Sequence, residues 1–93
     1  MISSFGDKYT EEIWGGTLVK GVPQATQQVA RRKLRMLNNS QNINDLRIPP
    51  SNHLEKLKGE FKEFYSIRIN DTWRIIFKWA NSNSELVKII NYH

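Results

Sequence analysis

The chain ends in two side chains that can transfer protons, Tyr92 and His93, directly after an apolar run typical of a β-strand. A histidine titrates near neutral pH and can either accept or donate a proton. A tyrosine can act as a base where neighbouring cations favour its phenolate form. Because chain ends usually carry little function, the pair becomes a candidate site only if the fold brings other charged side chains beside it.

Two arginines, Arg68 and Arg74, belong to segments with the periodicity of β-strands. Apolar and polar residues alternate in residues 64–70 and 73–79, which predicts two strands joined by a tight turn. A third strand is expected over residues 85–92, where the apolar run ends at the tyrosine. Together the three segments predict an antiparallel β-meander in the C-terminal part of the chain.

The alternation also determines which residues face each other in the first hairpin. Pairing Ile69 with Trp73 puts both apolar sets on one face and leaves a three-residue loop. A shift of one residue would send half of these side chains into water. The favoured register sets Arg68 directly opposite Arg74 on the other face, outside the core. Like charges in such positions repel each other, so either solvent screens them or an anion binds there.

The second hairpin brings the end of the chain to the same face as the arginines. Pairing Trp79 with Glu85 leaves a five-residue loop and sets Ile75 opposite Ile89. The face away from the apolar one then carries Arg68, Arg74, Lys78, Lys88 and Tyr92. His93 follows within one residue, so the last strand is predicted to deliver two titratable groups beside a cationic patch.

These residue types fit the cleavage of a phosphodiester bond in RNA. The reaction must remove a proton from a 2′-hydroxyl, return one to the leaving oxygen and stabilise charge on the phosphate. Arginine suits the last task because its planar guanidinium can bind a phosphate through two hydrogen bonds. The two histidines and the scattered carboxylates show no metal-ligand spacing, so neither a metal nor another cofactor is expected.

Composition points to a small intracellular protein with an anionic partner. A length of 93 residues predicts a single domain, 1–93. The net charge is +5, from 14 Lys and Arg against 9 Asp and Glu, which favours nucleic acid over a membrane or an acidic protein. The absence of cysteine excludes disulfides. With no apolar run of about 20 residues and no signal-peptide pattern, a cytoplasmic protein is expected.

The N-terminal half is predicted to be helical. Residues 1–5 could form a short strand, and residues 7–14 one or two helical turns. Residues 15–23 are expected to be a loop, because they contain three glycines and a proline. Residues 24–39 form the strongest predicted helix, and residues 43–59 a short turn followed by an ordered loop. The fold class expected is α/β in the α+β sense, with N-terminal helices packed on an antiparallel sheet.

The predicted helix over residues 24–39 is amphipathic and basic. Its apolar residues recur with helical spacing on one side. The opposite side carries Arg31, Arg32 and Arg35. Such a surface could bind RNA, or could be no more than a solvated face.

Several motifs resemble the HigB group of the RelE/ParE toxin superfamily. They are LEKLKGEFKEFYSIRINDTWRIIFKW, the preceding DLRIPPSNH, the opening MISSF, GVPQ before the basic helix, and the terminal Asn-Tyr-His. The resemblance extends over essentially the whole chain. It implies a compact RelE-like α/β fold with two N-terminal helices. It also implies a toxin of a type II toxin–antitoxin system, a metal-independent endoribonuclease that enters the ribosomal A site and cuts mRNA with the 2′-hydroxyl as nucleophile.

The resemblance implies roles for individual residues. Arg74 corresponds to a strand arginine that contacts the scissile phosphate, and Arg68 to a basic position on the preceding strand. Tyr92 and His93 correspond to a C-terminal catalytic pair. Asn91 stands where the family often has an aspartate and is assigned to the catalytic group by that correspondence, although an asparagine can neither accept a proton as a base nor stabilise an imidazolium by charge.

A second departure concerns the loop before Leu-Lys-Gly. Some family members carry a histidine there, whereas this chain has Glu55 at the aligned position and His53 two residues earlier. Either side chain could substitute, or neither takes part. The residues predicted to contact RNA or the ribosome are Arg31, Arg32, Arg35, His53, Lys56, Lys58, Lys78 and Lys88.

The partners that the resemblance implies are a HigA-like helix-turn-helix antitoxin, the 70S ribosome and mRNA. A monomeric toxin is expected in a hetero-oligomeric complex with the antitoxin that binds operator DNA. Two alternatives use the same basic face without catalysis: a nucleic-acid-binding module, and a protein-interaction module with an acidic partner. A pure binding module has no need of a terminal Tyr-His pair, so the terminus distinguishes these alternatives from the enzyme.

Overall fold

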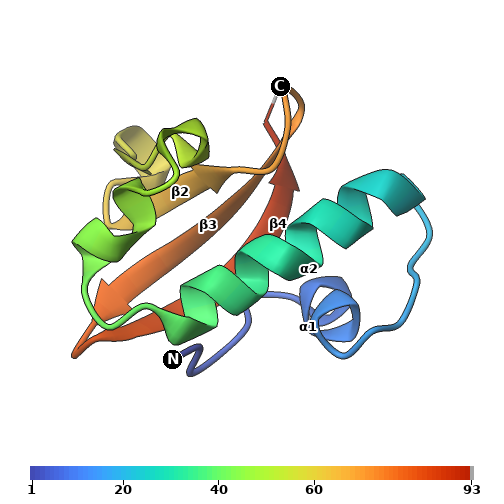
Figure 1. Cartoon of the computed structure of the whole chain (residues 1–93), viewed down its shortest axis with the longest axis horizontal. Coiled ribbons are helices and arrows are strands. Elements are labelled where there is room, and N and C mark those ends of the chain that lie inside the picture. Colours follow the sequence, from blue (N-terminus) through green and yellow to red (C-terminus); the bar gives the residue numbers. More distant parts are fainter. Residues whose placement is uncertain (93) are drawn as a thin grey trace.

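Two α-helices lie against a four-stranded antiparallel sheet (Figure 1). The computed structural model describes residues 1–92, and His93 lies outside the described residues. The helices are α1 (Lys8–Trp14) and α2 (Gln24–Asn39). The strands, which neighbour each other in chain order, are β1 (Glu55–Lys56), β2 (Phe64–Arg68), β3 (Trp73–Ala80) and β4 (Asn83–Asn91). This arrangement confirms the predicted α+β class.

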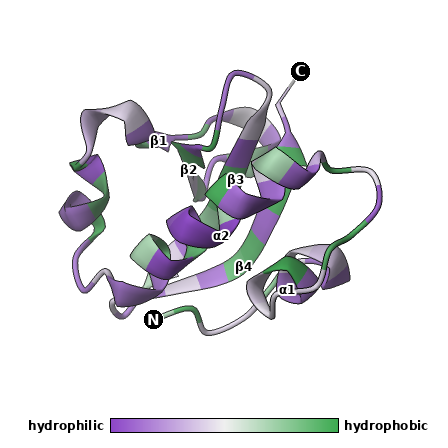
Figure 2. Cartoon of the chain, turned by 45° about the vertical axis from the view of Figure 1, so that its right-hand side comes forward, coloured by the Kyte–Doolittle hydropathy of each residue, from purple (hydrophilic) through white to green (hydrophobic). Residues whose placement is uncertain are grey.

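Both predicted helices are present, and local side chains explain where α1 begins and how α2 is oriented. The Asp7 carboxylate accepts a hydrogen bond from the Thr10 N–H at 3.0 Å, which caps the start of α1. α2 packs its apolar side on the sheet, and apolar residues alternate with polar ones along α2 and β4 (Figure 2). The fully buried apolar side chains of this core are Ile13, Ala30, Leu34, Leu37, Leu46, Ile67, Ile75, Phe77, Val87 and Ile89.

The glycine-rich loop over residues 15–23 is tied to α2 by one glutamine. Gln27 is buried, and its amide nitrogen donates to the carbonyls of Val19 and Val22 at 2.8 and 2.7 Å. Its amide oxygen accepts from the Val19 N–H at 3.0 Å. These three hydrogen bonds give the loop a defined path.

The first hairpin has the predicted register. Ile67 faces Ile75, and Arg68 faces Arg74 across β2 and β3. The Ile69 N–H donates to the Trp73 carbonyl at 2.9 Å, which continues the same pairing at the hairpin end. The two arginines therefore share the face of the sheet opposite the helix-covered one.

The second hairpin was predicted correctly at the arginine end only. Ile75 faces Ile89 as expected, but the predicted pairing of Trp79 with Glu85 is wrong because Trp79 faces Ser84. The five-residue loop is replaced by a tight turn at Asn81 and Ser82, both with positive φ.

A β-bulge absorbs the resulting one-residue difference in β4. The register shifts between Ile76 and Lys78, and Leu86 lies there with φ 52°. The bulge leaves the register next to Arg74 intact, so it changes the hairpin tip but not the candidate site.

Residues 43–59 contain more structure than the turn and loop that were predicted. They form the 3₁₀ helices η1 (Ile43–Arg47) and η2 (Pro50–Asn52), then β1, and they end where η3 (Gly59–Phe61) begins. β1 pairs with β2 and sets Glu55 opposite Ser66. A strand of two residues has too few positions to show alternation, which is why the sequence did not reveal it.

The free edge of β4 is covered by the N-terminal segment and α1. Ile2 and Phe5 form two isolated parallel bridges with Ser84 and Val87, so the strand predicted over residues 1–5 is present only as two contacts. Farther along the edge, the Tyr9 hydroxyl donates to the Ile89 carbonyl.

Thr10 and Gly6 complete this covered edge. The Thr10 hydroxyl accepts from the Ile89 N–H at 2.9 Å. A side chain at Gly6 would lie 2.6 Å from carbons of Lys88 and 2.9 Å from the Leu86 carbonyl oxygen, so only glycine fits.

None of the helices in the described part of the chain combines the length and apolar character needed to cross a membrane.

Candidate active site

A cleft of about 330 Å³ opens where β1, the residues that follow it and the end of β4 come together. Its lining mixes an acid, two lysines and two aromatic rings. The lining residues are Glu55, Lys56, Leu57, Lys58, Phe61 and Tyr92.

Arg74 adjoins this cleft and is held by three contacts. Its Nη2 donates to the His53 carbonyl at 2.7 Å, and its Nη1 to the Glu55 carboxylate at 3.3 Å. The guanidinium carbon lies 5.3 Å from the centroid of the Tyr92 ring, within cation–π range. Arg74 lies outside the apolar core cluster, as predicted, but its side chain is only 8% exposed. It lies away from the helices, but β1 and its flanking residues cover it.

Arg68 has a different environment, although it faces Arg74. It forms an ion pair with the exposed carboxylate of Asp71 in the β2–β3 loop. Each arginine thus has a carboxylate of its own, Asp71 or Glu55, which offsets the like-charge repulsion that the register creates. Neither solvent screening alone nor a bound anion is needed to explain the pair.

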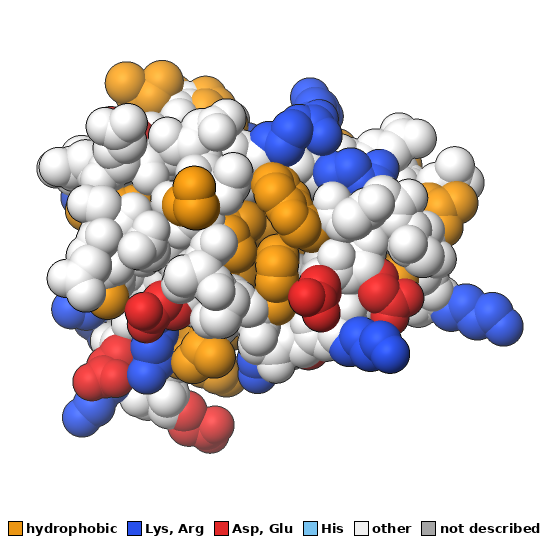
Figure 3. Space-filling view, turned by 90° about the horizontal axis from the view of Figure 1, so that it is seen from below, with side chains coloured by type: hydrophobic (Ala, Val, Ile, Leu, Met, Phe, Trp, Pro, Cys, Tyr) orange, Lys and Arg blue, Asp and Glu red, His pale blue; other side chains and the backbone are white. Residues whose placement is uncertain are grey.

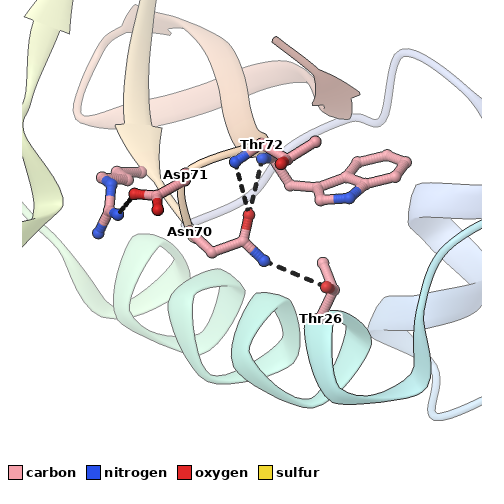
Figure 4. Close-up of polar contacts among 6 residues, drawn as sticks. Thr26, Asn70, Asp71 and Thr72 are labelled. Carbon is pink, nitrogen blue, oxygen red and sulfur yellow. Dashed lines mark hydrogen bonds and ion pairs between the residues drawn. The ribbon is translucent and has the colours of Figure 1, made fainter. Parts of the chain in front are cut away.

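The β2–β3 loop is fixed to α2 through Asn70 (Figure 4). The side-chain oxygen of Asn70 accepts from the N–H groups of Thr72 and Trp73, both at 2.9 Å. Its amide nitrogen donates to the Thr26 hydroxyl at 3.2 Å. The loop also holds the end of β4, because the Tyr92 N–H donates to the Thr72 carbonyl at 2.7 Å.

The terminal residues divide between the two faces of the sheet. Tyr92 is 47% exposed and lines the cleft on the Arg74 side. Asn91 faces Trp73, whose side chain is packed against the core cluster. Asn91 therefore belongs to the opposite face from Arg74, and the structure does not place it with the predicted catalytic group. The predicted partner His93 lies outside the described residues.

The lysines predicted to bind RNA differ in whether their ammonium groups already contact another side chain. Lys58 is exposed at the cleft and has no ion pair within residues 1–92. Lys56 also borders the cleft, but its ammonium lies 5.7 Å from the Tyr65 ring centroid. Lys78 is paired with Glu63 at 3.2 Å.

Two other predicted contacts lie outside this group. Lys88 shares the outer face by register but lies against Gly6 at the β4 edge and does not line the cleft. His53 is exposed, and its contact with Arg74 is through its backbone carbonyl.

The three helix arginines are not equivalent, which corrects the prediction of a uniform basic face. The Nε of Arg31 donates to the Ile13 carbonyl at 2.9 Å, so this side chain joins α2 to the end of α1. Arg32 and Arg35 are exposed. A helical projection could not separate them, because it contains no information about where α1 packs.

Two structural residues behind the site were not identified from the sequence. The Lys33 ammonium donates to the Asn52 side-chain oxygen at 2.5 Å, and Asn52 is fully buried in η2. Burial lowers the pKa of Lys33, and the charges of Arg32 and Arg68 lower it further. The link joins α2 to the residue before His53 and so supports the carbonyl that Arg74 binds. An asparagine near two prolines gave no signal of burial.

A family model and two named relatives agree on one family. A family model described as RelE-like toxin of type II toxin-antitoxin system HigB matches residues 3–93. An uncharacterized protein of Haemophilus influenzae is 48% identical over 80 residues, 84% of this chain and 78% of that protein. Toxin HigB-1 of Vibrio cholerae is 37% identical over 82 residues, 87% and 86% of the two chains. Endoribonuclease HigB of Proteus vulgaris is 26% identical over 93 residues, the full length of both.

Proposed function

Because the chain belongs to the HigB-like family of RelE-like toxins from type II toxin–antitoxin systems, we propose that it is an endoribonuclease. Its substrate is mRNA in the ribosomal A site, and its effect is to stop translation. The observation that carries this proposal is the contact of Arg74 with Tyr92 at a cleft that also presents lysines. The full-length match to a protein named Endoribonuclease HigB supports the same activity.

The proposed reaction is an attack of the 2′-oxygen on the adjacent phosphorus. The new O2′–P bond forms as the P–O5′ bond breaks, which leaves a cyclic phosphate and a 5′-hydroxyl. One proton leaves the 2′-hydroxyl and another joins the departing O5′. Tyr92 is proposed as the base and His93 as the acid, and no metal takes part.

Arg74 is proposed to stabilise the charge on the phosphate, with Arg68 as a second cation on the same face. A guanidinium has five N–H groups, and the contacts of Arg74 with His53 and Glu55 use two of them. Its Nε is buried and has no partner among the described residues. The Glu55 side chain is 52% exposed, so it can turn into solvent while a phosphate takes its place on Nη1.

The family name also implies an antitoxin. We propose a HigA-like antitoxin with a helix-turn-helix domain, which neutralises a monomeric toxin and carries the complex to operator DNA. The exposed Arg32 and Arg35 of α2 are proposed to contact ribosomal RNA. Because ribosomes are its proposed target, the active toxin is proposed to act in the cytoplasm.

The proposal is tested by inducing the toxin in growing cells and mapping new mRNA 5′ ends, with and without active translation. New ends within translated codons are expected, and they should disappear when initiation is blocked. Purified toxin should likewise cut mRNA on programmed ribosomes, and treating the toxin with EDTA before it is exchanged into the Mg²⁺-containing ribosome buffer should leave the rate unchanged. Ribosome or RNA binding without any new ends would instead support the non-enzymatic nucleic-acid-binding module.

A further inference from the structure

A phenylalanine ring is exposed beside the charged side chains of the cleft. Phe61 lies at the end of η3, is 39% exposed and lines the cleft together with Tyr92. Its sequence neighbours Glu60 and Lys62 are charged and exposed. The ring therefore lies between charged sequence neighbours, and together with Tyr92 it supplies the exposed aromatic surface of the cleft.

A second aromatic side chain fixes the position of this ring. The rings of Phe61 and Phe64 meet edge to face, with centroids 5.7 Å apart and planes at 88°. Phe64 begins β2, and its carbonyl accepts from the Leu57 N–H at 2.8 Å. The ammonium of Lys78 lies 5.5 Å from the Phe64 ring centroid and is itself bound by Glu63. The exposed ring is thus attached to the sheet, and its remaining surface is available to a ligand.

We propose that the cleft binds one unpaired nucleobase of the RNA substrate, stacked on Phe61, with Lys58 bound to a phosphate of the same strand. Proteins that bind single-stranded RNA combine aromatic rings with cations, because every base has a π-face and every linkage carries a charge. The cleft of about 330 Å³ is near the lower limit for small-ligand sites, which suits one base and not a run of bases. The inference rests on the proposed function, from which the RNA substrate is taken.

The position of the cleft relates this base to the bond that is cut. Glu55 lines the cleft and binds Arg74, and Tyr92 lines it and lies against Arg74. A base on Phe61 would therefore belong to a nucleotide close to the phosphate on Arg74. Stacking there fixes the position of the substrate without touching the reacting atoms, so Phe61 is a positioning residue.

Replacing Phe61 with leucine tests the stacking directly, because leucine keeps apolar volume but has no flat ring. In single-turnover cleavage on programmed ribosomes, Phe61→Leu should raise the half-saturating toxin concentration about 5- to 100-fold. The rate at saturation should stay within about twofold, and Phe61→Trp should behave like the parent. Leu18→Ala is the matched control, since Leu18 is another exposed apolar residue but does not line the cleft. An unchanged half-saturating concentration for Phe61→Leu would overturn the inference.

Abasic nucleotides identify the stacked base. With the parent protein, one abasic position in or beside the A-site codon should weaken binding by the same factor as Phe61→Leu. The leucine variant should then lose nothing more at that position, because both changes remove the same contact. Additive losses at every position would show that Phe61 only packs against Phe64.

The experiments distinguish a failure of the proposed endoribonuclease function from a failure of the proposed base site. If the folded parent protein cuts no mRNA on or off ribosomes, the proposed function is wrong. The cleft is then tested by equilibrium binding of a single-stranded oligoribonucleotide. Weaker binding by Phe61→Leu would support the base site, and equal binding would overturn it.

Discussion

The guanidinium of Arg74 adjoins the cleft and also fixes the residues before and within β1 to the sheet. It donates to the His53 carbonyl and to Glu55, and it is almost fully buried. Removal of this side chain would leave the carbonyl without its donor and the carboxylate without its partner. A loss of toxicity in an Arg74 variant therefore has two possible causes, which a stability measurement must separate.

For Arg74→Ala we expect both a loss of cleavage and a decrease of about 1–3 kcal/mol in the free energy of unfolding. Arg68→Ala is the comparison, because Arg68 is paired with an exposed carboxylate and such pairs contribute at most about 1 kcal/mol. Urea unfolding of both variants, alongside single-turnover cleavage, measures the two effects. Equal stability of the two variants would contradict the bracing role of Arg74, and full activity of Arg74→Ala would contradict its catalytic role.

Tyr92 allows the proton-transfer role to be separated from the ring. Its hydroxyl makes no hydrogen bond within residues 1–92, and its backbone is held by Thr72. Tyr92→Phe should therefore melt like the parent, while its single-turnover rate falls about 10²- to 10⁴-fold if the hydroxyl is the base. A nearly normal rate would rule out proton transfer and leave stacking on the substrate, which Tyr92→Leu would then remove.

At the scale of elements, α1 stabilises the sheet by covering the edge of β4. Tyr9 donates its hydroxyl proton to the Ile89 carbonyl, and Thr10 accepts from the Ile89 N–H. An uncovered strand edge is a template for pairing with another chain. These contacts therefore both protect and stabilise β4, the strand that leads to Tyr92.

The Tyr9 contact predicts a specific dependence of stability on pH. Burial, and to a smaller extent the charge of Asp7, raises the pKa of Tyr9 from 10.0 to about 12. Below pH 10 the phenol is protonated in both states and its contribution is complete. Between pH 10 and about 12 the unfolded chain loses the proton first, so the contribution is lost as pH rises.

Tyr9→Phe should cost about 1 kcal/mol of unfolding free energy at pH 8, for the lost hydrogen bond. The difference between parent and variant should shrink as pH rises above 10, and urea unfolding at pH 8, 10 and 11 measures it. The other titrating groups are common to both proteins, so they cancel in this difference. If the difference in unfolding free energy between parent and variant stayed constant over this range, the proposed raised pKa of Tyr9 would be contradicted.

The sequence predicted a strand register correctly where both paired strands bury apolar side chains. The register of Arg68 and Arg74 was predictable because a one-residue shift would expose Ile67 and Ile75 to water. The tip of the second hairpin has no such constraint, so its tight turn and the bulge at Leu86 could not be foreseen.

The burial of polar side chains that join distant elements could not be predicted either. Arg31, Asn52 and Gln27 are polar residues whose burial depends on where other segments pack. The structure pairs Asn91 with Trp73, on the face away from Arg74. Its assignment to the catalytic group came from the family resemblance alone.

At the scale of the whole molecule, the net charge of +5 overstates the free cationic surface. Several cations have internal partners: Arg31, Lys33, Arg68, Arg74 and Lys78. On the face seen in Figure 3, acidic side chains lie among the basic ones, around an apolar middle. Steering by charge should therefore come from a few positions and not from the surface as a whole.

Arg32 and Arg35 are the positions on α2 that remain exposed, so the double variant Arg32→Ala/Arg35→Ala is expected to bind ribosomes more weakly. If each arginine contacts a phosphate, the slope of log affinity against log salt should fall by about 1.4–1.8 in magnitude, because each contact releases counterions. The variant Lys8→Ala/Lys20→Ala is the matched control, since it removes two exposed charges outside α2. Arg31 is left in place because its loss would disturb the contact between α1 and α2. Ribosome co-sedimentation over a range of salt concentrations measures the slopes. Equal slopes for the two double variants would mean that α2 contributes only overall charge, whereas a smaller slope for the α2 variant alone would assign the ribosome contact to this helix.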